Sequence, residues 1–369
     1  ARTQHQKNAD FISVKDFGAV GDGTTDDTAA IQAAIDQAGN NTEIVIPVGV
    51  YKTTAKLTLG QRKHLRGAGK YATKILFAPT ANATCLEISN GGSVVDQGSV
   101  SELCLYSDDS TYTKIGIDLV DANSFNIDHV SIGGSVVVSS SSYWSGANSI
   151  GLRVRGRQTT GIRDIDIAAD RPIVVATNPN NIISIDHFNF HNLYLIANAN
   201  PVVEILTGVN LTQVSFTGYQ AWVRGTSGLK WADTTTTLVS NGLFIENVRL
   251  EQGTDATAYS FDISHNQALQ GLSLRRCYVG VDRRGMKLRK VEDVSLDGQY
   301  HAGANVALDV DATVKRITGI ACYWQASSTA TLTGQRYVRA SPYNPNTGAL
   351  PPDFYLDESA NASRNEIHD

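Results

Sequence analysis

A short pattern recurs about nine times between Val100 and Cys322, and it restricts the fold more than any other feature of the chain. Each copy has an apolar residue, two polar or turn-forming residues, an apolar residue, any residue and a final apolar residue. The clearest copies are Ile127–Ile132, Ile185–Phe190 and Ile245–Leu250, and looser copies start at Val100, Ile162, Leu211, Leu274, Val291 and Ile317. Successive copies start 27, 35, 23, 26, 34, 29, 17 and 26 residues apart. A repeat of this length indicates stacked supersecondary units.

The residues of the pattern favour β-strands. The copies are rich in Val, Ile, Leu and Phe and alternate with period two around the polar pair. The polar pair suits a bend between two strands, and a unit of about 27 residues holds roughly three strands with their turns. Three strands per coil, wound in one direction, make a parallel β-helix whose coils stack about 4.8 Å apart and share one core. Since parallel crossovers are right-handed, we predict an all-β, right-handed, single-stranded parallel β-helix.

Other repeat architectures fit the sequence less well. Leucine-rich repeats have a denser leucine pattern, and propeller blades of about 40–45 residues carry marker dipeptides that this chain lacks. The two longest intervals contain Ser139–Gly146 and Ala221–Ser240, which are rich in Ser or Thr. We expect both segments to be loops that protrude from the coils.

The repeat extends through most of the 369 residues, so we expect one elongated β-helical domain over residues 11–325. Residues 1–10 are expected to be an N-terminal arm or a cloning remnant. Residues 326–369 contain two proline-rich stretches and predict an extended tail. Within this tail Asn361–Ile367 resembles a strand that stops abruptly, which indicates either packing against a partner chain or a missing C-terminal domain.

Composition excludes several functional classes. The net charge of −5, from 31 Lys and Arg and 36 Asp and Glu, provides no basic field for nucleic acid. No apolar run is long enough for a membrane-spanning helix, so we expect no membrane insertion. The four cysteines lie far apart without CxxC spacing and predict buried thiols. The nearest approach to a metal motif is Asp186-His187 with His191, whose side chains a strand–turn–strand would place on different faces, so we expect no metal and no cofactor.

The N-terminal segment predicts a short helix over residues about 25–38. Ile31, Ala34, Ile35 and Ala38 recur at helical spacing, and Gly39 follows them. Such a helix would cover the open end of the first coil, which otherwise exposes apolar side chains and unpaired backbone. The acidic residues before and at its start are explained by turn formation and helix capping; these are Asp16, Asp22, Asp26 and Asp27.

This segment resembles the opening of the pectate-lyase-like β-helix superfamily. The resemblance lies in Asp16–Ile35 (DFGAVGDGTTDDTAAIQAAI), and Gly49–Tyr51 and Leu65–Gly69 are similar to the next coils of that family. Members include pectin-cleaving lyases, polygalacturonases, other polysaccharide enzymes and phage tailspike depolymerases. The Ser/Thr/Asn-rich coils and few cysteines are most similar to the tailspike branch. That resemblance implies a homotrimer on a phage tail that binds and cleaves bacterial surface polysaccharide outside the cell, with a secreted protein as the alternative.

The repeat also predicts which side chains face outward from one long sheet. In each copy the residue between the last two apolar residues, and the residue after the copy, point to solvent. An extended sugar chain would need such a strip, with aromatic groups, hydrogen-bonding groups and acids. The predicted substrate-binding residues on this strip and in the expected loops are Tyr106, Asn189, His191, Trp222, Trp231, Arg249 and Tyr278. The two tryptophans are equally consistent with loop packing.

Hydrolysis of a glycosidic bond requires two carboxyl groups. The pattern places Glu251 and Asp297 in register two coils apart, with backbones about 9–10 Å apart. That separation is close to the range of about 6.5–9.5 Å found in inverting glycosidases. Asp166, on the same strip, and Glu246, at a bend, are the other catalytic candidates. The predicted activity is therefore that of a polysaccharide depolymerase of the hydrolase class.

Two alternatives remain open from the sequence. A polysaccharide lyase acting on a uronic acid would need a base and a group that neutralises the carboxylate, and Arg249, Arg275 and Arg276 could serve. A non-catalytic adhesin would bind the glycan on the same strip without cleaving it.

Overall fold

The computed structural model describes most of the chain between Phe11 and Asp357. The described residues are 11–133, 144, 146–158, 161–178, 184–197, 200–223, 226–235, 239–251, 257–280, 284–311, 313–332, 336–337 and 354–357. The expected arm 1–10, most of the expected loop Ser139–Gly146 and the expected strand Asn361–Ile367 lie outside them. Among the described residues, no helix combines the length and the apolar character needed to cross a membrane.

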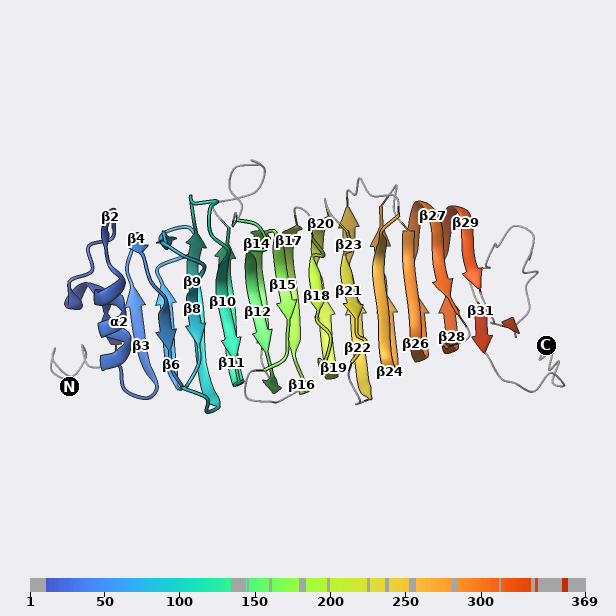
Figure 1. Ribbon diagram of the computed structural model, residues 1–369, viewed down its shortest axis with the longest axis horizontal. Helices are drawn as coiled ribbons and strands as arrows, with labels where there is room; N and C mark the ends of the chain where they lie inside the picture. Colours follow the sequence, from blue (N-terminus) through green and yellow to red (C-terminus); the bar gives the residue numbers. More distant parts are fainter. Residues whose placement is uncertain are drawn as a thin grey trace, which may run out of the picture. The chain divides into compact units, whose positions relative to one another are not determined.

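The chain divides into two units. Unit 1 consists of Ala1–Ile182 and Phe188–Leu195, and unit 2 consists of Ile183–His187 and Ile196–Asp369. In each unit, strands of successive coils pair in parallel, and Figure 1 shows them lying side by side. The predicted parallel β-helix is therefore confirmed, and each unit is described by itself below.

The described residues of unit 1 form two short helices near its start and otherwise strands. The bounds are β1 (Phe11–Ser13), η1 (Val14–Phe17), β2 (Asp22–Asp26), α2 (Thr28–Gln37), β3 (Thr42–Ile46), β4 (Gly49–Thr53), β5 (Leu57–Leu59), β6 (Lys63–Gly67), β7 (Thr73–Phe77), β8 (Ala83–Ile88), β9 (Val95–Tyr106), β10 (Lys114–Val120), β11 (Ala122–Ile132), β12 (Ile150–Arg155), β13 (Arg157–Gln158), β14 (Gly161–Ala169), β15 (Arg171–Val175) and most of β17 (Asn189–Ala197).

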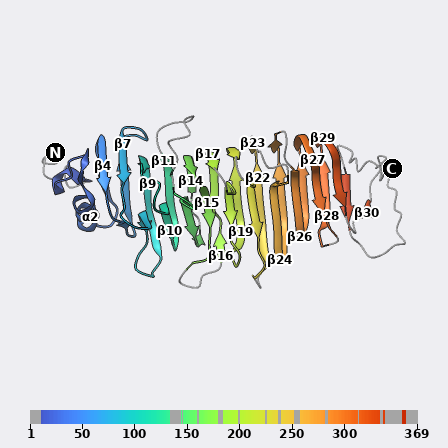
Figure 2. The ribbon, with the colours of Figure 1, turned by 45° about the horizontal axis from the view of Figure 1, so that its top comes forward.

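The predicted cap helix is confirmed as α2, which lies among the first strands of unit 1 (Figure 2). Its apolar stripe of Ile31, Ala34 and Ile35 is buried. It starts later than predicted because residues 22–26 form β2, which pairs with β4. Asp22 accepts hydrogen bonds from the backbone N–H groups of Thr24 and Thr25, and Asp26 accepts one from the backbone N–H of Thr28 at 3.0 Å, as turn formation predicts. The N-cap residue Asp27 makes no capping hydrogen bond, and its carboxylate instead accepts from the backbone N–H groups of Val20 and Gly21.

The core of unit 1 is built from inward side chains that stack coil on coil. Leu65 pairs with Val100 of the next coil, and Val100 pairs with Ile127. Ile127 in turn pairs with Ile162, and all four side chains are fully buried. The copies of the pattern at Val100, Ile127 and Ile162 therefore occupy one position in successive coils. Stacking removes these apolar side chains from water, which no single coil could achieve.

Unit 2 consists of strands alone among its described residues. The bounds are β16 (Ser184–Asp186), β18 (Val203–Ile205), β19 (Asn210–Thr217), β20 (Gln220–Val223), β21 (Leu229–Ala232), β22 (Ser240–Glu246), β23 (Arg249–Glu251), β24 (Tyr259–Arg275), β25 (Tyr278–Val279), β26 (Arg284–Asp297), β27 (Tyr300–Val310), β28 (Lys315–Ile320), β29 (Tyr323–Leu332), β30 (Arg336–Tyr337) and β31 (Phe354–Asp357). β29 continues the parallel pairing to Leu332, and β31 then pairs antiparallel with β28.

The prediction that Ala221–Ser240 forms a protruding loop is wrong. The segment contains most of β20 and all of β21, both of which pair in parallel with later coils. Alternation in Leu229-Lys230-Trp231 has strand periodicity, with Leu229 and Trp231 buried and Lys230 on the other face. The run of threonines after β21 obscured this short strand in the sequence.

Many bends between strands are single residues in the left-handed backbone region. In unit 1 one corner stacks Glu102, His129, Asp164 and Asn192, with φ between 50° and 59°, and a second corner stacks Asn41, Arg62, Gln97 and Ser124, with φ between 53° and 61°. In unit 2 one corner stacks Gln213, Gly242, Gly271, Asp293 and Arg316, and a second corner stacks Gly218, Asn247, Arg276, Gly298 and Ala321. None of these residues is β-branched, because branching at Cβ makes a positive φ costly. This requirement explains the polar pair of the pattern.

The two corners of unit 2 also explain the irregular intervals in the sequence. The copies at Leu211 and Val291 bend at the first corner, whereas those at Ile245 and Leu274 bend at the second. Moving from one corner to the other lengthens one interval to 34 residues and shortens another to 17. The pattern was thus recognised correctly, but its copies do not all occupy one position in the coil.

The four cysteines are buried thiols, as predicted, and none forms a disulfide. Burial raises the pKa of the Cys277 thiol to about 12, so this thiol stays protonated at neutral pH. Such groups behave as small core side chains and do not act as nucleophiles.

Candidate functional site

A row of charged side chains precedes the second corner of unit 2. Glu246 pairs in register with Arg275 of the next coil, and Arg275 pairs with Asp297 of the coil after that. Arg275 Nε lies 3.4 Å from Asp297 Oδ2, and the bend residue Arg276 donates from Nη2 to Glu246 Oε1 at 2.7 Å. All four side chains are at least a quarter exposed. The strands β22, β24 and β26 that carry this row are labelled in Figure 1.

A ridge of aromatic and cationic side chains runs along the other side of the same corner. Arg249, Tyr278 and Tyr300 follow the members of the charged row by three residues and pair in register over three coils. The two tyrosine rings stack with centroids 5.1 Å apart and an interplanar angle of 7°. The guanidinium carbon of Arg249 lies 5.3 Å from the centroid of the Tyr278 ring. Because Arg249 and Tyr300 cover both faces of Tyr278, that residue offers its ring edge and hydroxyl to a ligand.

The predicted register of Glu251 with Asp297 is wrong. Glu251 lies on β23 and pairs with Trp222 of β20, whereas Asp297 lies on β26 and pairs through Arg275 with Glu246. The error follows from the mixing of the two corners described above. The carboxylates that stand in register two coils apart are Glu246 and Asp297. Glu251 forms an ion pair with Arg249 and borders the ridge.

The two predicted tryptophans differ in environment. Trp222 is half-buried on β20, next to Glu251. Trp231 is fully buried in the core of unit 2, where its ring packs edge-to-face against His265 with centroids 4.7 Å apart. The prediction that Trp231 contacts substrate is therefore wrong, because its indole has no exposed surface.

The remaining predicted residues lie in unit 1. Asp166 of β14 stands in register with Ser131. Lys70 Nζ lies 2.5 Å from Asp166 Oδ2, and the Tyr71 hydroxyl donates to the same oxygen at 3.1 Å. Burial and the Asp166 charge raise the pKa of Tyr71 to about 12, so its phenol remains protonated and can donate. Lys70 and Tyr71 come from the connection after β6, and the sequence pattern gave no reason to place them there.

The strip of unit 1 is less exposed than predicted. Ser131, which the pattern placed outward and which pairs in register with Asp166, is only 2% exposed. Tyr106 is half-buried on β9, and burial is the main reason that its pKa is raised. Asn189 and His191 are exposed on β17, as predicted for a surface strip. In unit 1, therefore, the predicted strip is only partly open.

A buried Ser–His–Asp set in unit 2 looks like a nucleophilic site but has the wrong connectivity. Ser240 Oγ lies 3.1 Å from His265 Nε2, and Asp233 Oδ2 lies 3.9 Å from the same nitrogen. The other nitrogen, Nδ1, accepts from the backbone N–H of Gln267. In a working triad the hydroxyl and the carboxylate bind opposite nitrogens. All three side chains are buried, and burial is the main cause that lowers the pKa of His265, so the set is part of the core.

Comparison with known proteins identifies the family. Residues 11–214, more than half of the chain, match the model of the family described as rhamnogalacturonase A/epimerase, pectate lyase-like. The chain belongs to this family. The predicted membership of the pectate-lyase-like superfamily is thus confirmed. The matched residues end before Glu246, so the family match does not extend to the charged row and the ridge.

The curated relatives are matched over only a small part of their own length. Mannuronan C5-epimerase AlgE1 of Azotobacter vinelandii is 40% identical over 105 residues, which are 25% of this chain and 7% of that protein. Depolymerase 1, capsule K3-specific, of Klebsiella phage KP32 is 38% identical over 125 residues, which are 29% of this chain and 14% of that protein. The tail spike protein of Shigella phage Sf6 is 42% identical over 77 residues, which are 19% of this chain and 12% of that protein.

Solved structures support the fold. The A-module of mannuronan C-5 epimerase AlgE4 from Azotobacter vinelandii has a TM-score of 0.62 at 18% identity, covering 87% of this chain and 94% of that one. Tailspike protein 3 of bacteriophage CBA120 has a TM-score of 0.56 at 13% identity, covering 89% of this chain and 56% of that one. At such identities the likeness concerns the fold alone.

Proposed function

We propose that the chain is part of a phage tailspike-like depolymerase that binds and hydrolyses a bacterial surface polysaccharide. The observation that carries this proposal is the arrangement at the second corner of unit 2. Two carboxylates, Glu246 and Asp297, stand in register two coils apart, and the ridge of Arg249, Tyr278 and Tyr300 runs beside them. Similarity to a phage depolymerase and to a phage tail spike protein supports the substrate class.

The spacing of the two carboxylates suits hydrolysis with inversion. Two sheet spacings separate their backbones by about 9–10 Å. Inverting glycosidases hold their carboxyl groups about 6.5–9.5 Å apart, which leaves room for a water molecule on the far side of the sugar. One carboxyl group would protonate the leaving oxygen while the other removes a proton from that water. The length of both side chains would allow the two carboxyl groups to come within this range.

The ridge would hold the sugar chain along the coil axis. Its phenol hydroxyls and the Arg249 guanidinium can donate hydrogen bonds to sugar hydroxyls, and the tyrosine edges pack against the apolar C–H groups of the ring. Trp222 and Glu251 border the ridge on β20 and β23. The stacked rings are already ordered before substrate arrives, which lowers the entropic cost of binding.

The contacts of the arginines favour hydrolysis over elimination. A lyase needs a base and a cation that neutralises the substrate carboxylate. Arg275 and Arg276 instead contact Asp297 and Glu246, so their charge is balanced by carboxylates of the protein itself. On the basis of the similarity to a phage depolymerase and a phage tail spike protein, we also propose that the protein forms a homotrimer on a phage tail and acts outside the bacterial cell.

Product analysis tests the proposed reaction. The chain is incubated with a panel of capsular, exopolysaccharide and lipopolysaccharide glycans, and reducing ends and ultraviolet absorbance are measured together. We expect new reducing ends without unsaturated products, and inverted anomeric configuration in the first product seen by NMR. Unsaturated products would contradict hydrolysis in favour of a lyase, and stable binding without products would identify an adhesin.

The ridge makes a separate prediction about affinity. Tyr278→Ala removes the ring that joins Arg249 to Tyr300, and Tyr278→Phe removes only the hydroxyl. We expect KM to rise about 10–30-fold for the alanine variant, equivalent to about 1.4–2 kcal/mol, and less than about 10-fold for the phenylalanine variant. Tyr259→Phe, at the start of β24, removes a hydroxyl from another strand of unit 2 and should leave KM unchanged. Equal KM values for wild type and Tyr278→Ala would rule out the ridge as a binding surface.

A further inference from the structure

The tripeptide Ile-Asp-His occurs twice in the chain, each time at a bend. Ile127-Asp128-His129 lies in β11 of unit 1, and Ile185-Asp186-His187 lies at the end of β16 in unit 2. Both histidines have a left-handed backbone, with φ of 50° at His129 and 53° at His187. The two copies therefore have the same local sequence and conformation. They differ in what the neighbouring coils place beside them.

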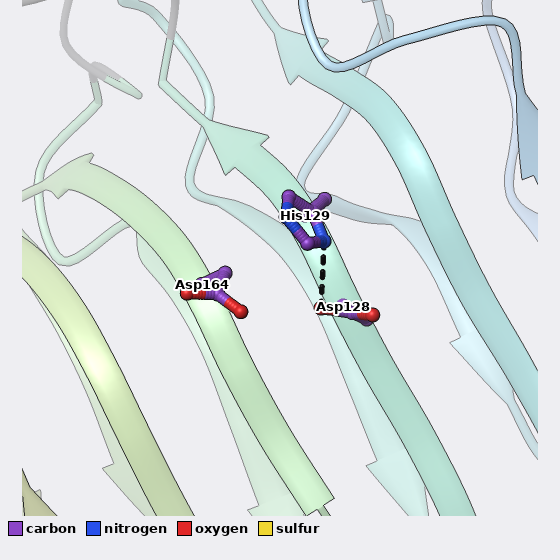
Figure 3. Close-up of side chains that lie close together, drawn as sticks. All are labelled: Asp128, His129 and Asp164. Atoms are coloured by element: carbon purple, nitrogen blue, oxygen red, sulfur yellow. Dashed lines mark ion pairs between the residues drawn. The ribbon is translucent and has the colours of Figure 1, made fainter.

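Beside His129 the stacked bends bring metal-ligating atoms together (Figure 3). Asp164 is the bend residue of the next coil, on β14. One ligand atom from each of Asp128, His129 and Asp164 lies within 4.8 Å of the others. His129 Nδ1 is 2.8 Å from Asp128 Oδ1 and 3.9 Å from Oε1 of Glu102, the bend residue of the preceding coil. Among the described residues this is the only group of His, Cys, Asp or Glu that meets these distances.

Neighbouring side chains hold both aspartate carboxylates in place by hydrogen bonds. Arg163 Nη2 donates to Asp128 Oδ2 at 3.1 Å, and the Asn192 amide donates to Asp164 Oδ1. Asp128 Oδ1 is shielded from solvent and accepts no hydrogen bond among the described residues, although it faces the imidazole. Ligating carboxylates in metal sites are commonly held by outer hydrogen bonds of this kind.

We propose that Asp128, His129 and Asp164 form a binding site for a divalent transition-metal ion such as Zn²⁺, with Glu102 available as a fourth ligand. An imidazole combined with two or three carboxylates suits such ions, whereas Ca²⁺ and Mg²⁺ favour oxygen ligands alone. The ion would offset the negative charge of the clustered carboxylates and connect β11 to β14. Its role is to cross-link successive coils of unit 1, and it does not depend on the proposed hydrolysis in unit 2.

The second Ile-Asp-His copy provides a matched control. His187 is exposed at the end of β16, and no cluster of ligating residues around it meets the same distances among the described residues. Asparagine tolerates the left-handed region, so His129→Asn and His187→Asn should both fold. The pair therefore separates loss of a specific ligand from loss of any histidine at a bend.

Metal titration of tag-free, EDTA-treated protein tests the site. Zn²⁺ binding is measured by calorimetry, Co²⁺ binding by visible absorbance, and thermal unfolding with and without Zn²⁺. We expect one ion per chain, a higher Tm in the presence of Zn²⁺, and unchanged binding in His187→Asn. His129→Asn should weaken binding by more than about 100-fold, because losing a direct ligand costs at least as much as losing an outer partner. Asp164→Asn should weaken binding by at least about 10-fold.

Three results would overturn the proposal. The first is no binding of either ion up to millimolar concentration. The second is equal affinity for wild type and His129→Asn, which would place the ion elsewhere. The third is equal loss in His129→Asn and His187→Asn, which would indicate non-specific coordination by surface histidines.

Discussion

Glu246→Gln and Asp297→Asn are each expected to lower kcat by about 10²–10⁴-fold, the usual contribution of a positioned acid or base. Both substitutions keep the size of the side chain and remove its ability to carry or release a proton at neutral pH. Because both side chains are partly exposed and their ion pairs lie at the surface, stability should change by less than about 1 kcal/mol. Turnover on the identified glycan and thermal unfolding together measure the two effects.

A matched control is available on the same strand as Asp297. Glu292 on β26 is also partly exposed and ion-paired, with Lys315 and Arg316, but it lies at the first corner. Glu292→Gln should therefore leave kcat within about two-fold, because outward polar groups away from the site act only through weak surface pairs. Full turnover in both Glu246→Gln and Asp297→Asn would refute the assignment.

Substitution of Glu251 tests the register seen in the structure against the register expected from the pattern. Its carboxylate faces Arg249 beside the ridge, so Glu251→Gln should alter KM more than kcat. A loss of kcat as large as that of Asp297→Asn would instead return Glu251 to the catalytic pair. Rescue of one variant by azide, with an inverted glycosyl azide as product, would then show which carboxylate acts as the base.

The sequence predicted the coil because the coil depends on local chemistry. Alternating apolar residues define the inward columns such as Val100, Ile127 and Ile162, and the polar pair marks a bend that only unbranched side chains tolerate. The cap helix was equally local, with one apolar stripe and acidic residues before it. These features need no knowledge of distant residues.

The sequence does not reveal at which of the two corners each copy of the pattern bends. Both corners of unit 2 impose the same requirement on the backbone, so Gln213 and Asn247 are preceded and followed by similar residues although they occupy different corners. A one-dimensional pattern cannot distinguish the two. That ambiguity displaced Glu251 into the catalytic pair and left the ridge residue Tyr300 unrecognised, although Tyr278 was predicted.

Contacts over long sequence separations were also inaccessible. Lys70 and Tyr71 reach Asp166 from a connection three coils earlier in the chain, and no local pattern links them. The cluster of Asp128, His129 and Asp164 likewise forms only when two coils stack. Sequence inspection instead noted the second Ile-Asp-His copy, beside which no comparable group occurs among the described residues.

Trp231→Ala is expected to destabilise unit 2 by about 3–5 kcal/mol, the usual cost of removing a large buried aromatic side chain. Its indole is fully buried, packs on His265 and pairs through β21 with β24, so no neighbouring side chain can fill the space without moving the strands. The loss of stability is measured by denaturant-induced unfolding and, in a separate experiment, by hydrogen exchange in β21 and β24. Trp231→Phe should recover about half of it because a smaller cavity remains.

Trp222→Ala should affect substrate binding more than stability. Its side chain is half-buried beside Glu251, so truncation should cost less than about 2 kcal/mol of stability and should raise KM for the glycan. Comparing the two variants separates core packing from substrate contact for residues that the sequence could not distinguish. If Trp231→Ala left the free energy of unfolding unchanged while Trp222→Ala lowered it by several kcal/mol, the packing of β20 and β21 described above would be wrong. The position of the ridge relative to the core of unit 2 would then be wrong as well.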